Sequence, residues 1–241
     1  MLFRSEDNQL NDDPRWNGYP TPPTSNANYG WLLNTLSKLG QNGVGVVLLA
    51  NGALSADGEE KEIRKRMIEN DCVEAIVVLP QNMFYTTGIS VTVWILNKNK
   101  KSRIEKRPDG DVTFHDRTDE VLFMDLRQMG HPYEKKYIEF TEEDRAVIVD
   151  RFKSWRLDGY TTAYENIPEF CYSAKKSEIA GKDYSLVPSR YIEFINRDEA
   201  VDYEEKMAQL QEELKELLAQ EQQSRKDLLE VMKGLGYAIE I

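Results

Sequence analysis

The sequence predicts an α/β protein that contains part of a doubly wound sheet and continues into a mostly helical tail. Two short apolar runs at 44–50 and 73–79 are rich in β-branched side chains, which is typical of strands buried on both faces. A segment with helical spacing precedes each run, and a third run of the same kind, 90–96, follows after only ten residues. The order over residues 26–97 is therefore helix, strand, helix, strand, strand.

The chain opens on a loop and a helix, although an α/β domain normally begins with a strand. Residues 1–24 are polar and carry four prolines within ten positions, so we expect an extended loop. Apolar side chains then recur at helical spacing before Gly40 and predict an amphipathic helix over about 26–39. They are Tyr29, Leu32, Leu33, Leu36 and Leu39.

The directions of the three strands follow from their connections. A helix predicted from about 57 to 70, with Asp57 as its N-cap, joins 44–50 to 73–79, so these two strands should be parallel. No helix separates 73–79 from 90–96, and the third strand should therefore run antiparallel to its neighbours.

The region after the third strand is heterogeneous. A charged insertion spans 98–120, and its first ten residues hold six basic side chains and one acid. A further strand is predicted near 121–124. Thr141 caps a helix with the apolar face Ile148, Phe152 and Trp155. Residues 160–195 are aromatic-rich and irregular, with an extended piece near 170–174.

The last segment predicts one long helix. Asn196 and Glu199 can cap it, and Gly234 and Gly236 end it. Its apolar residues alternate at four and three positions, a seam of heptad type: Tyr203, Met207, Leu210, Leu214, Leu217, Leu228 and Val231. We divide the chain into a loop (1–24), an α/β region (25–140), a helix with an irregular segment (141–195) and a C-terminal helix (196–241).

Composition excludes several classes of function. The net charge of −11 argues against sequence-independent binding of nucleic acid, and no apolar run approaches the ~20 residues of a membrane span. Cys72 and Cys171 are typical of reduced thiols in a cytoplasmic protein. Two histidines, His115 and His131, lie in no Cys/His cluster, so no metal site is expected.

No acid/base pair or nucleophile stands out. The glycines of 43–45 follow a helix and open a strand, which is the wrong context for a phosphate loop. The Thr-Pro-Pro-Thr segment at 21–24 has neither amide nor carboxylate, and we interpret it as a stiff loop. Acid pairs at 59–60 and 142–143 lie at helix starts, where the helix dipole favours negative charge.

The segment 79–90 is the most informative for function. It connects two strands and presents two aromatic rings, Phe84 and Tyr85, together with Thr86, Thr87 and Gly88. In open α/β sheets ligands bind at loops beyond the strand ends, and an aromatic ring there can stack on a nucleobase. The alternative is that one ring only closes the end of the core.

At this point the residues resemble a known family. From residue 11 to about 101 the chain closely resembles the modification subunit of type I restriction-modification systems, an adenine-N6 DNA methyltransferase. The matching segments are 12–16, 25–29, 48–54, 63–65 and 84–98, and 184–192 is similar to the subunit's C-terminal region. The resemblance implies the C-terminal half of a Rossmann-like methyltransferase sheet, with two parallel strands plus one antiparallel strand.

The resemblance also implies a mechanism. Such enzymes extrude the target adenine from the duplex, and an Asn/Asp-Pro-Pro-Phe/Tyr tetrapeptide accepts hydrogen bonds from its amine. An aromatic on the loop before the antiparallel strand stacks on the base. The motif match assigns this role to Phe84, or to its neighbour Tyr85, and places Pro80, Thr86, Thr87 and Gly88 in the base-pocket loop.

The sequence departs from the family pattern in one respect. The tetrapeptide, the Gly-rich loop for S-adenosylmethionine and the acid that holds its ribose precede the matched region in the family. We therefore expect no catalytic residue, no bound cofactor and no methyl transfer from this polypeptide alone. Strand 44–50 should then lack a neighbour on one side, and we expect self-association through it.

Two further partners are implied. In the family the C-terminal helices contact the DNA-specificity subunit, so the seam of the last helix is a candidate subunit contact. Lys98, Lys100, Lys101 and Arg103 are candidates for DNA phosphate contacts, although the net charge of −11 slightly favours the alternative of a solvated hairpin. Alternatives to an incomplete methyltransferase are a non-catalytic module that binds the specificity subunit and an unrelated α/β protein that binds a planar ligand.

Overall fold

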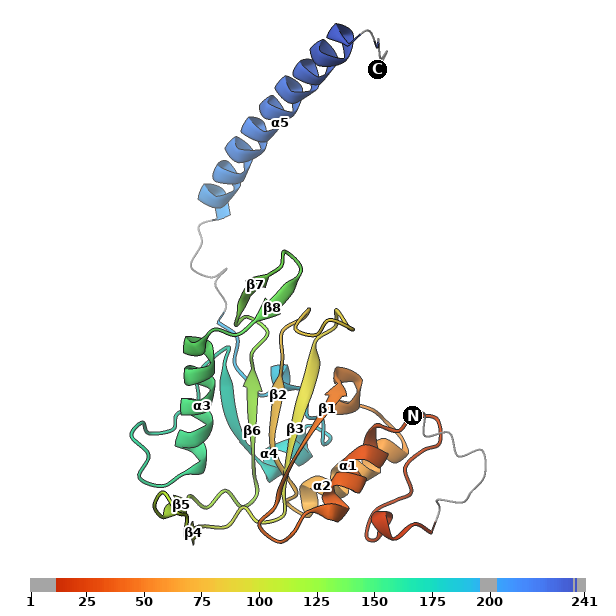
Figure 1. Cartoon of the computed structure of the whole chain (residues 1–241), viewed down its shortest axis with the longest axis vertical. Coiled ribbons are helices and arrows are strands. Elements are labelled where there is room, and N and C mark those ends of the chain that lie inside the picture. Colours follow the sequence, from red (N-terminus) through yellow and green to blue (C-terminus); the bar gives the residue numbers. More distant parts are fainter. Residues whose placement is uncertain (1–11, 196–202, 236, 238–241) are drawn as a thin grey trace. The chain divides into compact units, whose positions relative to one another are not determined.

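A computed structural model describes residues 12–195, 203–235 and 237 of the chain (Figure 1). Two compact units are distinguished, Met1–Phe194 and Ile195–Ile241. The first eleven residues of the predicted loop and the predicted cap at 196–199 lie outside the described residues.

A five-stranded sheet forms the centre of the first unit, with the order β1-β3-β2-β6-β9. Its strands are β1 (Val44–Ala50), β2 (Val73–Val78), β3 (Val91–Asn97), β6 (Glu120–Asp125) and β9 (Cys171–Lys175). β2 and β6 pair in parallel, and every other neighbouring pair is antiparallel. β3 lies between β1 and β2 and opposes both, so β1 and β2 run in the same direction, as predicted, without touching. The further strand predicted near 121–124 is β6 and the extended piece predicted near 170–174 is β9, and both add to the three strands predicted from 44 to 96.

The prediction that the first strand is buried on both faces is wrong. Val46 is 62% exposed and Leu48 is 51% exposed, whereas every residue of β2 is buried, as predicted. The pairing places Val46 opposite Ile95 and Leu48 opposite Val93 on one face of the sheet. The residues that pack on this face cover β2 and β6, and β1 at the edge stays open to solvent.

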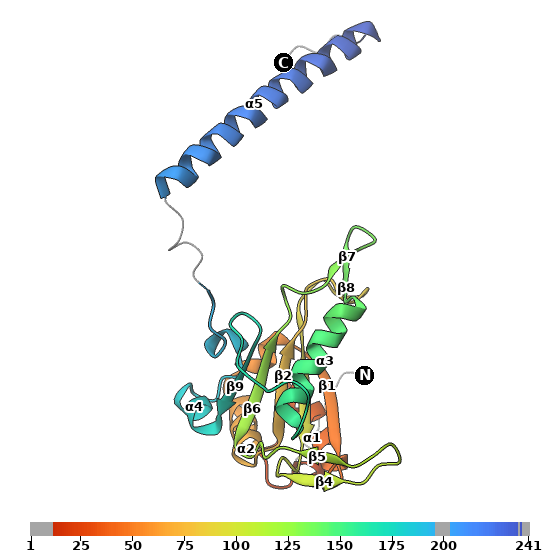
Figure 2. The ribbon, with the colours of Figure 1, turned by 90° about the vertical axis from the view of Figure 1, so that its left-hand side faces the viewer.

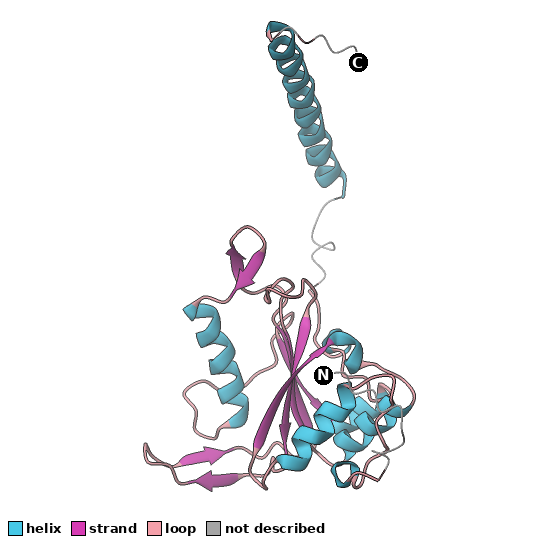
Figure 3. Cartoon of the chain, turned by 45° about the vertical axis from the view of Figure 1, so that its right-hand side comes forward, coloured by secondary structure: helices cyan, strands magenta, loops and turns pink. Residues whose placement is uncertain are grey.

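Helices cover both faces of the sheet (Figure 3). α1 (Asn28–Lys38) and α2 (Glu59–Glu69) lie on one side, and α3 (Glu142–Arg156) lies on the other. Tyr29, Leu32, Ile63 and Met67 bury their side chains with Trp94 and Phe123 of the sheet in the first core layer. Trp155 of α3, with Ala75, Val77, Leu122 and Met124, forms the second.

The two predicted helix caps had different outcomes. Thr141 caps α3 in a capping box: its hydroxyl accepts from the amide of Asp144, whose carboxylate accepts from the amide of Thr141. Asp57 does not cap α2. The helix begins one residue later, after Gly58, whose positive φ of 66° leaves no capping side chain at that position.

Two hairpins project from opposite ends of the sheet (Figures 1 and 2). β4 (Arg103–Glu105) and β5 (Val112–Phe114) form one within the charged insertion, and β7 (His131–Tyr133) and β8 (Tyr137–Glu139) form the other. A short helix, α4 (Lys176–Gly181), follows β9. The β7–β8 hairpin was not predicted from the sequence, because its strands are only three residues each.

A buried charge cluster joins the sheet to α3. Glu74 of β2 is completely buried, and it pairs with Arg117 at 3.3 Å and with Arg156 at 3.1 Å. The second carboxylate oxygen of Glu74 accepts from Nδ2 of Asn97 at 3.0 Å. Because Arg117 is also fully buried, the ion pair with Glu74 offsets a charge that water does not reach, although Nε and Nη2 of Arg117 make no hydrogen bond with a described residue.

The second unit is the helix α5 (Tyr203–Gly234). The described apolar residues of its predicted seam are exposed within the chain: Met207, Leu210, Leu214, Leu217, Leu228 and Val231. Among the described residues, no helix combines the length and the apolar composition needed to cross a bilayer.

Candidate functional site

The candidate site is the loop that connects β2 to β3. It lies at the end of the sheet where the parallel strands β2 and β6 terminate, together with the β7–β8 hairpin (Figure 1). At its base the amide of Leu79 donates to the carbonyl of Val91 at 2.9 Å, and the hydroxyl of Ser90 donates to the carbonyl of Leu79 at 2.5 Å. These two hydrogen bonds hold the two ends of the loop together beneath its tip.

The two aromatic rings of the loop have different environments. The amide of Thr87 donates to the carbonyl of Phe84 at 3.3 Å, which closes a tight turn over the tip. Phe84 is partly buried and packs against the core layer under α3. Tyr85 is 69% exposed. The motif match names Phe84 first, whereas exposure leaves the face of Tyr85 more open to a planar ligand.

The β7–β8 hairpin supports the loop from the side. The amide of Ile138 donates to the carbonyl of Asn82 at 3.1 Å, and the rings of Tyr85 and Tyr137 are in contact. Gly130, with a positive φ of 86°, permits this approach, because a Cβ there would lie 2.7 Å from Cγ2 of Ile138. Sequence reasoning missed Asn82 and Tyr137. Asn82 has a left-handed φ of 57°, so the only signal in the sequence was the asparagine itself, a residue type that tolerates this conformation.

A cleft of about 590 Å³ lies between this loop and the hairpin, and Pro80, Asn82, Arg127 and Ile138 contribute to its walls. Arg127 forms a two-pronged ion pair with Asp125, at 2.5 Å and 2.9 Å, and this contact raises the pKa of the Arg127 guanidinium. Asp125 therefore has its carboxylate occupied and does not serve as a free base.

The remaining predicted loop residues differ in how far they are buried. Pro80 is buried. Thr86 and Gly88 are exposed, and Thr87 is half-buried with its Oγ1 accepting from the amide of Ile89 at 3.4 Å. A Cβ on Gly88 would lie 3.0 Å from Oδ1 of Asn82, so a larger residue would crowd the turn.

The predicted basic cluster lies at the other end of β3. Seven residues at roughly 3.3 Å each separate it from the aromatic loop by about 20 Å. Lys98 and Lys101 are exposed. Arg103 pairs with Glu105 at 2.8 Å and stacks over the ring of Phe114.

Lys100 is not available for a phosphate contact, which corrects the sequence-based expectation. It is 2% exposed, and its ammonium pairs with Asp71 at 2.5 Å and donates to two carbonyl oxygens, of Val73 and Glu120. Burial lowers the pKa of Lys100. The charge of Lys100 therefore stabilises a buried ion pair with Asp71.

Other reactive side chains are dispersed. In the part of the chain that the structure describes, no group of three His, Cys, Asp or Glu side chains is arranged to hold a metal. Cys72 and Cys171 are buried free thiols whose pKa burial raises. His115 pairs with Asp158 and His131 pairs with Glu139, and both histidines are exposed.

Within the described part of the chain, the loop between β1 and α2 presents no open site for S-adenosylmethionine. The loop between β1 and α2 is the position where a strand leads into a helix and where a cofactor would meet backbone amides. Other parts of the protein already bond to this loop. The hydroxyl of Tyr29 donates to the carbonyl of Ala53 at 2.6 Å, and the amide of Leu186 donates to the carbonyl of Leu54 at 2.9 Å. Leu54 and Ala53 are themselves buried.

Comparison with known proteins identifies the family. Residues 3–200 match the N-6 DNA Methylase family, and the chain belongs to it. The chain is similar to the type I restriction enzyme HindI methylase subunit of Haemophilus influenzae, with 38% identity over 95% of this chain and 48% of that protein. It is also 34% identical to the MjaIX methylase subunit of Methanocaldococcus jannaschii, over 94% of this chain and 39% of that protein. The resemblance found in the sequence is thereby confirmed.

A solved structure agrees with the fold. The type I restriction-modification methyltransferase subunit from Streptococcus thermophilus superposes with a TM-score of 0.63 and 29% identity, over 77% of this chain and 34% of that one. The chain spans about half the length of the HindI methylase subunit. It spans less than half the length of the MjaIX subunit and of the Streptococcus thermophilus subunit. The activity of those full-length proteins is assigned to this chain only as a proposal.

Proposed function

We propose that this chain is part of an adenine-N6 DNA methyltransferase of a type I restriction-modification system, and that its 79–90 loop receives the extruded adenine. The observation that carries the proposal is the exposed ring of Tyr85, held against the ring of Tyr137 at the end of the parallel strands. Base–aromatic stacking supplies ~1–3 kcal/mol per base, enough to favour an unpaired adenine over a paired one.

The loop residues divide the work. Tyr85 stacks on the base, and Phe84, which the motif match favours, anchors the turn from below and is the alternative stacking ring. Pro80 and Gly88 shape the backbone so that the tip stays tight. Thr86 and Thr87 place hydroxyls at the rim, and exposed Lys98 and Lys101 are the remaining candidates for phosphate contacts.

This polypeptide alone does not transfer a methyl group in our proposal. Its sequence contains no Asn/Asp-Pro-Pro-Phe/Tyr tetrapeptide, and the described β1–α2 loop offers no cofactor site. In the whole enzyme S-adenosylmethionine supplies the methyl group. This chain's own residues hold the base by stacking on Tyr85 or Phe84.

A second candidate is a non-catalytic module that binds the DNA-specificity subunit. The exposed apolar seam of α5 favours it, because isolated helices gain most of their stability from packing against a partner. The two candidates are compatible, since stacking and subunit contact use different units of the chain.

Binding to paired and unpaired adenine tests the proposal. Two labelled duplexes are compared by fluorescence anisotropy, one fully paired and one with an abasic site opposite a single adenine, where extrusion costs least. We expect tighter binding of the second duplex, and we expect Tyr85→Ala to remove roughly tenfold or more of this preference. Phe84→Ala separates the two rings, and Tyr237→Ala, an exposed tyrosine outside the loop, is the control. Equal affinity of the wild-type chain for both duplexes would refute the proposal.

A further inference from the structure

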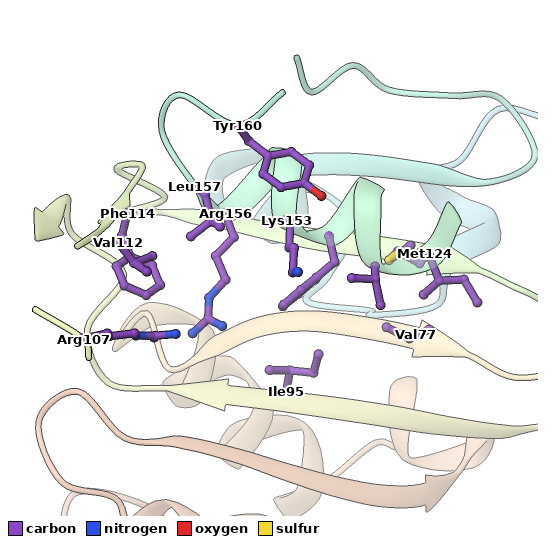
Figure 4. A pocket seen from close by; sticks show the side chains of 13 residues that line it. Val77, Ile95, Arg107, Val112, Phe114, Met124, Lys153, Arg156, Leu157 and Tyr160 are labelled. Atoms are coloured by element: carbon purple, nitrogen blue, oxygen red, sulfur yellow. The ribbon is translucent and has the colours of Figure 1, made fainter. Parts of the chain in front are cut away.

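A separate cavity of about 520 Å³ lies between α3, the sheet and the β4–β5 hairpin (Figure 4). Val77, Ile95 and Met124 form its floor on the sheet, and Ile148 and Phe152 form its roof on α3. Ligand-binding pockets of roughly 300–1,000 Å³ with mainly apolar walls are typical of sites for small molecules. Neither Phe84 nor Tyr85 lines this cavity, so it is distinct from the loop described above.

The polar groups of this cavity carry one sign of charge. Arg107, Lys153 and Arg156 contribute to its wall, with the tyrosine Tyr160, and none of its lining residues is acidic. Figure 4 shows the side chains of Lys153 and Arg156 reaching from the helix toward the sheet. A positive cavity in a chain of net charge −11 is not a consequence of composition.

The positive charge is only partly neutralised. Four guanidiniums, of Arg103, Arg107, Arg117 and Arg156, lie within 5.9 Å of the ring centre of Phe114, and two carboxylates, of Glu74 and Glu105, are shared among them. Lys153 forms no ion pair with a described residue. Nε of Arg156 donates to Glu74, and no described residue accepts from its Nη atoms.

We propose that this cavity binds a small organic carboxylate with an apolar body. The body lies against Val77, Ile95 and Ile148, and the carboxylate lies between Lys153 and Arg156, with Arg107 at the open side. A charged hydrogen bond to a guanidinium is about twice as strong as a neutral one, and the apolar walls strengthen it further. An uncharged ligand of the same shape gains only the free energy of burying its apolar body.

A matched pair of probes tests the proposal with the full chain. Isothermal titration compares 1-naphthoate with 1-naphthamide, which has a similar shape and no charge, and acetate, which has charge and almost no apolar body. We expect 1:1 binding of naphthoate with a dissociation constant below about 1 mM and at least tenfold weaker binding of the other two. Methyl NMR then locates the site: the signals of Ile95, Ile148 and Met124 should shift, and that of Ile63, in the other core layer, should not.

Variants separate the contributions of charge and shape. Lys153→Gln and Arg107→Gln should each weaken naphthoate binding several-fold without changing naphthamide binding, while Lys38→Gln on α1 should change neither. Val149→Trp, on the α3 side of the cavity, should fill it and abolish binding of both probes. The methyl spectrum of each variant verifies that it is folded.

Any of several results would overturn the proposal. They are equal affinity for naphthoate and naphthamide, methyl shifts outside the cavity, and binding that Lys153→Gln and Val149→Trp leave unchanged. Absence of binding at several millimolar probe would also overturn it. None of these results depends on DNA binding, so the proposed function and this inference fail independently.

Discussion

The rings of Tyr85 and Tyr137 meet edge to face, with their centres 4.7 Å apart and their planes at 71°. Tyr85 belongs to the loop between β2 and β3, and Tyr137 begins β8 about fifty positions later. The backbone bond from Ile138 to Asn82 is the second link between the same two segments. The hairpin therefore fixes the orientation of the ring that we propose to stack on adenine.

Removing the ring of Tyr137 should make the orientation of Tyr85 less fixed, although Tyr137 does not itself contact the adenine in our proposal. An edge-to-face pair is worth ~0.5–1.5 kcal/mol, so Tyr137→Ala should reduce the preference for the abasic duplex by roughly two- to tenfold. Tyr137→Phe keeps the ring and should retain the preference. If Tyr137→Ala binds both duplexes as the wild-type chain does, the hairpin does not position Tyr85.

The buried cluster around Glu74 should dominate the stability of the first unit. Glu74→Ala leaves Arg117 buried without its carboxylate and should lower the free energy of unfolding by about 3–5 kcal/mol. Urea denaturation measures the change. Glu142→Ala, which removes an exposed ion pair with Arg145, is the matched control and should cost less than about 1 kcal/mol. Similar losses in both variants would contradict this assignment.

The open edge of β1 should promote self-association. β1 ends the sheet, and Val44, Val46 and Leu48 expose apolar side chains beside its unpaired backbone groups. We expect a concentration-dependent oligomer in size-exclusion chromatography with light scattering, and we expect Val46→Lys with Leu48→Lys to shift it toward monomer. A clean wild-type monomer at tens of micromolar would refute this expectation.

The seam of α5 should mediate subunit contact. Deleting residues 199–241 should abolish co-purification with a specificity subunit, while the far-UV circular dichroism of the α/β unit persists. Leu214→Lys with Leu217→Lys should act like the deletion, because it charges the seam. Gln209→Lys with Gln223→Lys adds the same charge outside the seam and should leave co-purification intact. Retained co-purification after the deletion would exclude α5 as the contact.

Asp13 should report on the folded N-terminal turn as pH falls. The guanidinium of Arg15 hydrogen-bonds its carboxylate and lowers the pKa of Asp13 from 3.8 to about 2. A carboxyl with a lowered pKa stabilises the fold above its unfolded pKa, and this contribution is lost as pH falls from near 4 toward 2. Carboxyl ¹³C NMR follows the titration. Arg15→Gln should return the pKa toward 3.8, and an unchanged value would show that another group holds it.

The sequence alone predicted much of the local structure. The helical spacing of Tyr29, Leu33 and Leu36 gave α1 to within two residues, and Thr141 marked the start of α3. The connection lengths predicted the direction of β3 correctly. Each of these features depends on residues close together in the chain, where propensity, capping and periodicity act.

The sequence determined by itself the family, the order of the main elements and the aromatic loop between two strands. Only the tertiary structure decided that β1 is half exposed, that Lys100 is buried, that Tyr137 contacts Tyr85, and that three cations line one apolar cavity. Exposure and contact depend on which distant segments pack together. Lys100 and Asp71 become partners because β3 pairs with β2, and Glu74 and Arg156 become partners because α3 packs on the sheet. Both contacts join residues that are far apart in the sequence, so local sequence patterns do not reveal them.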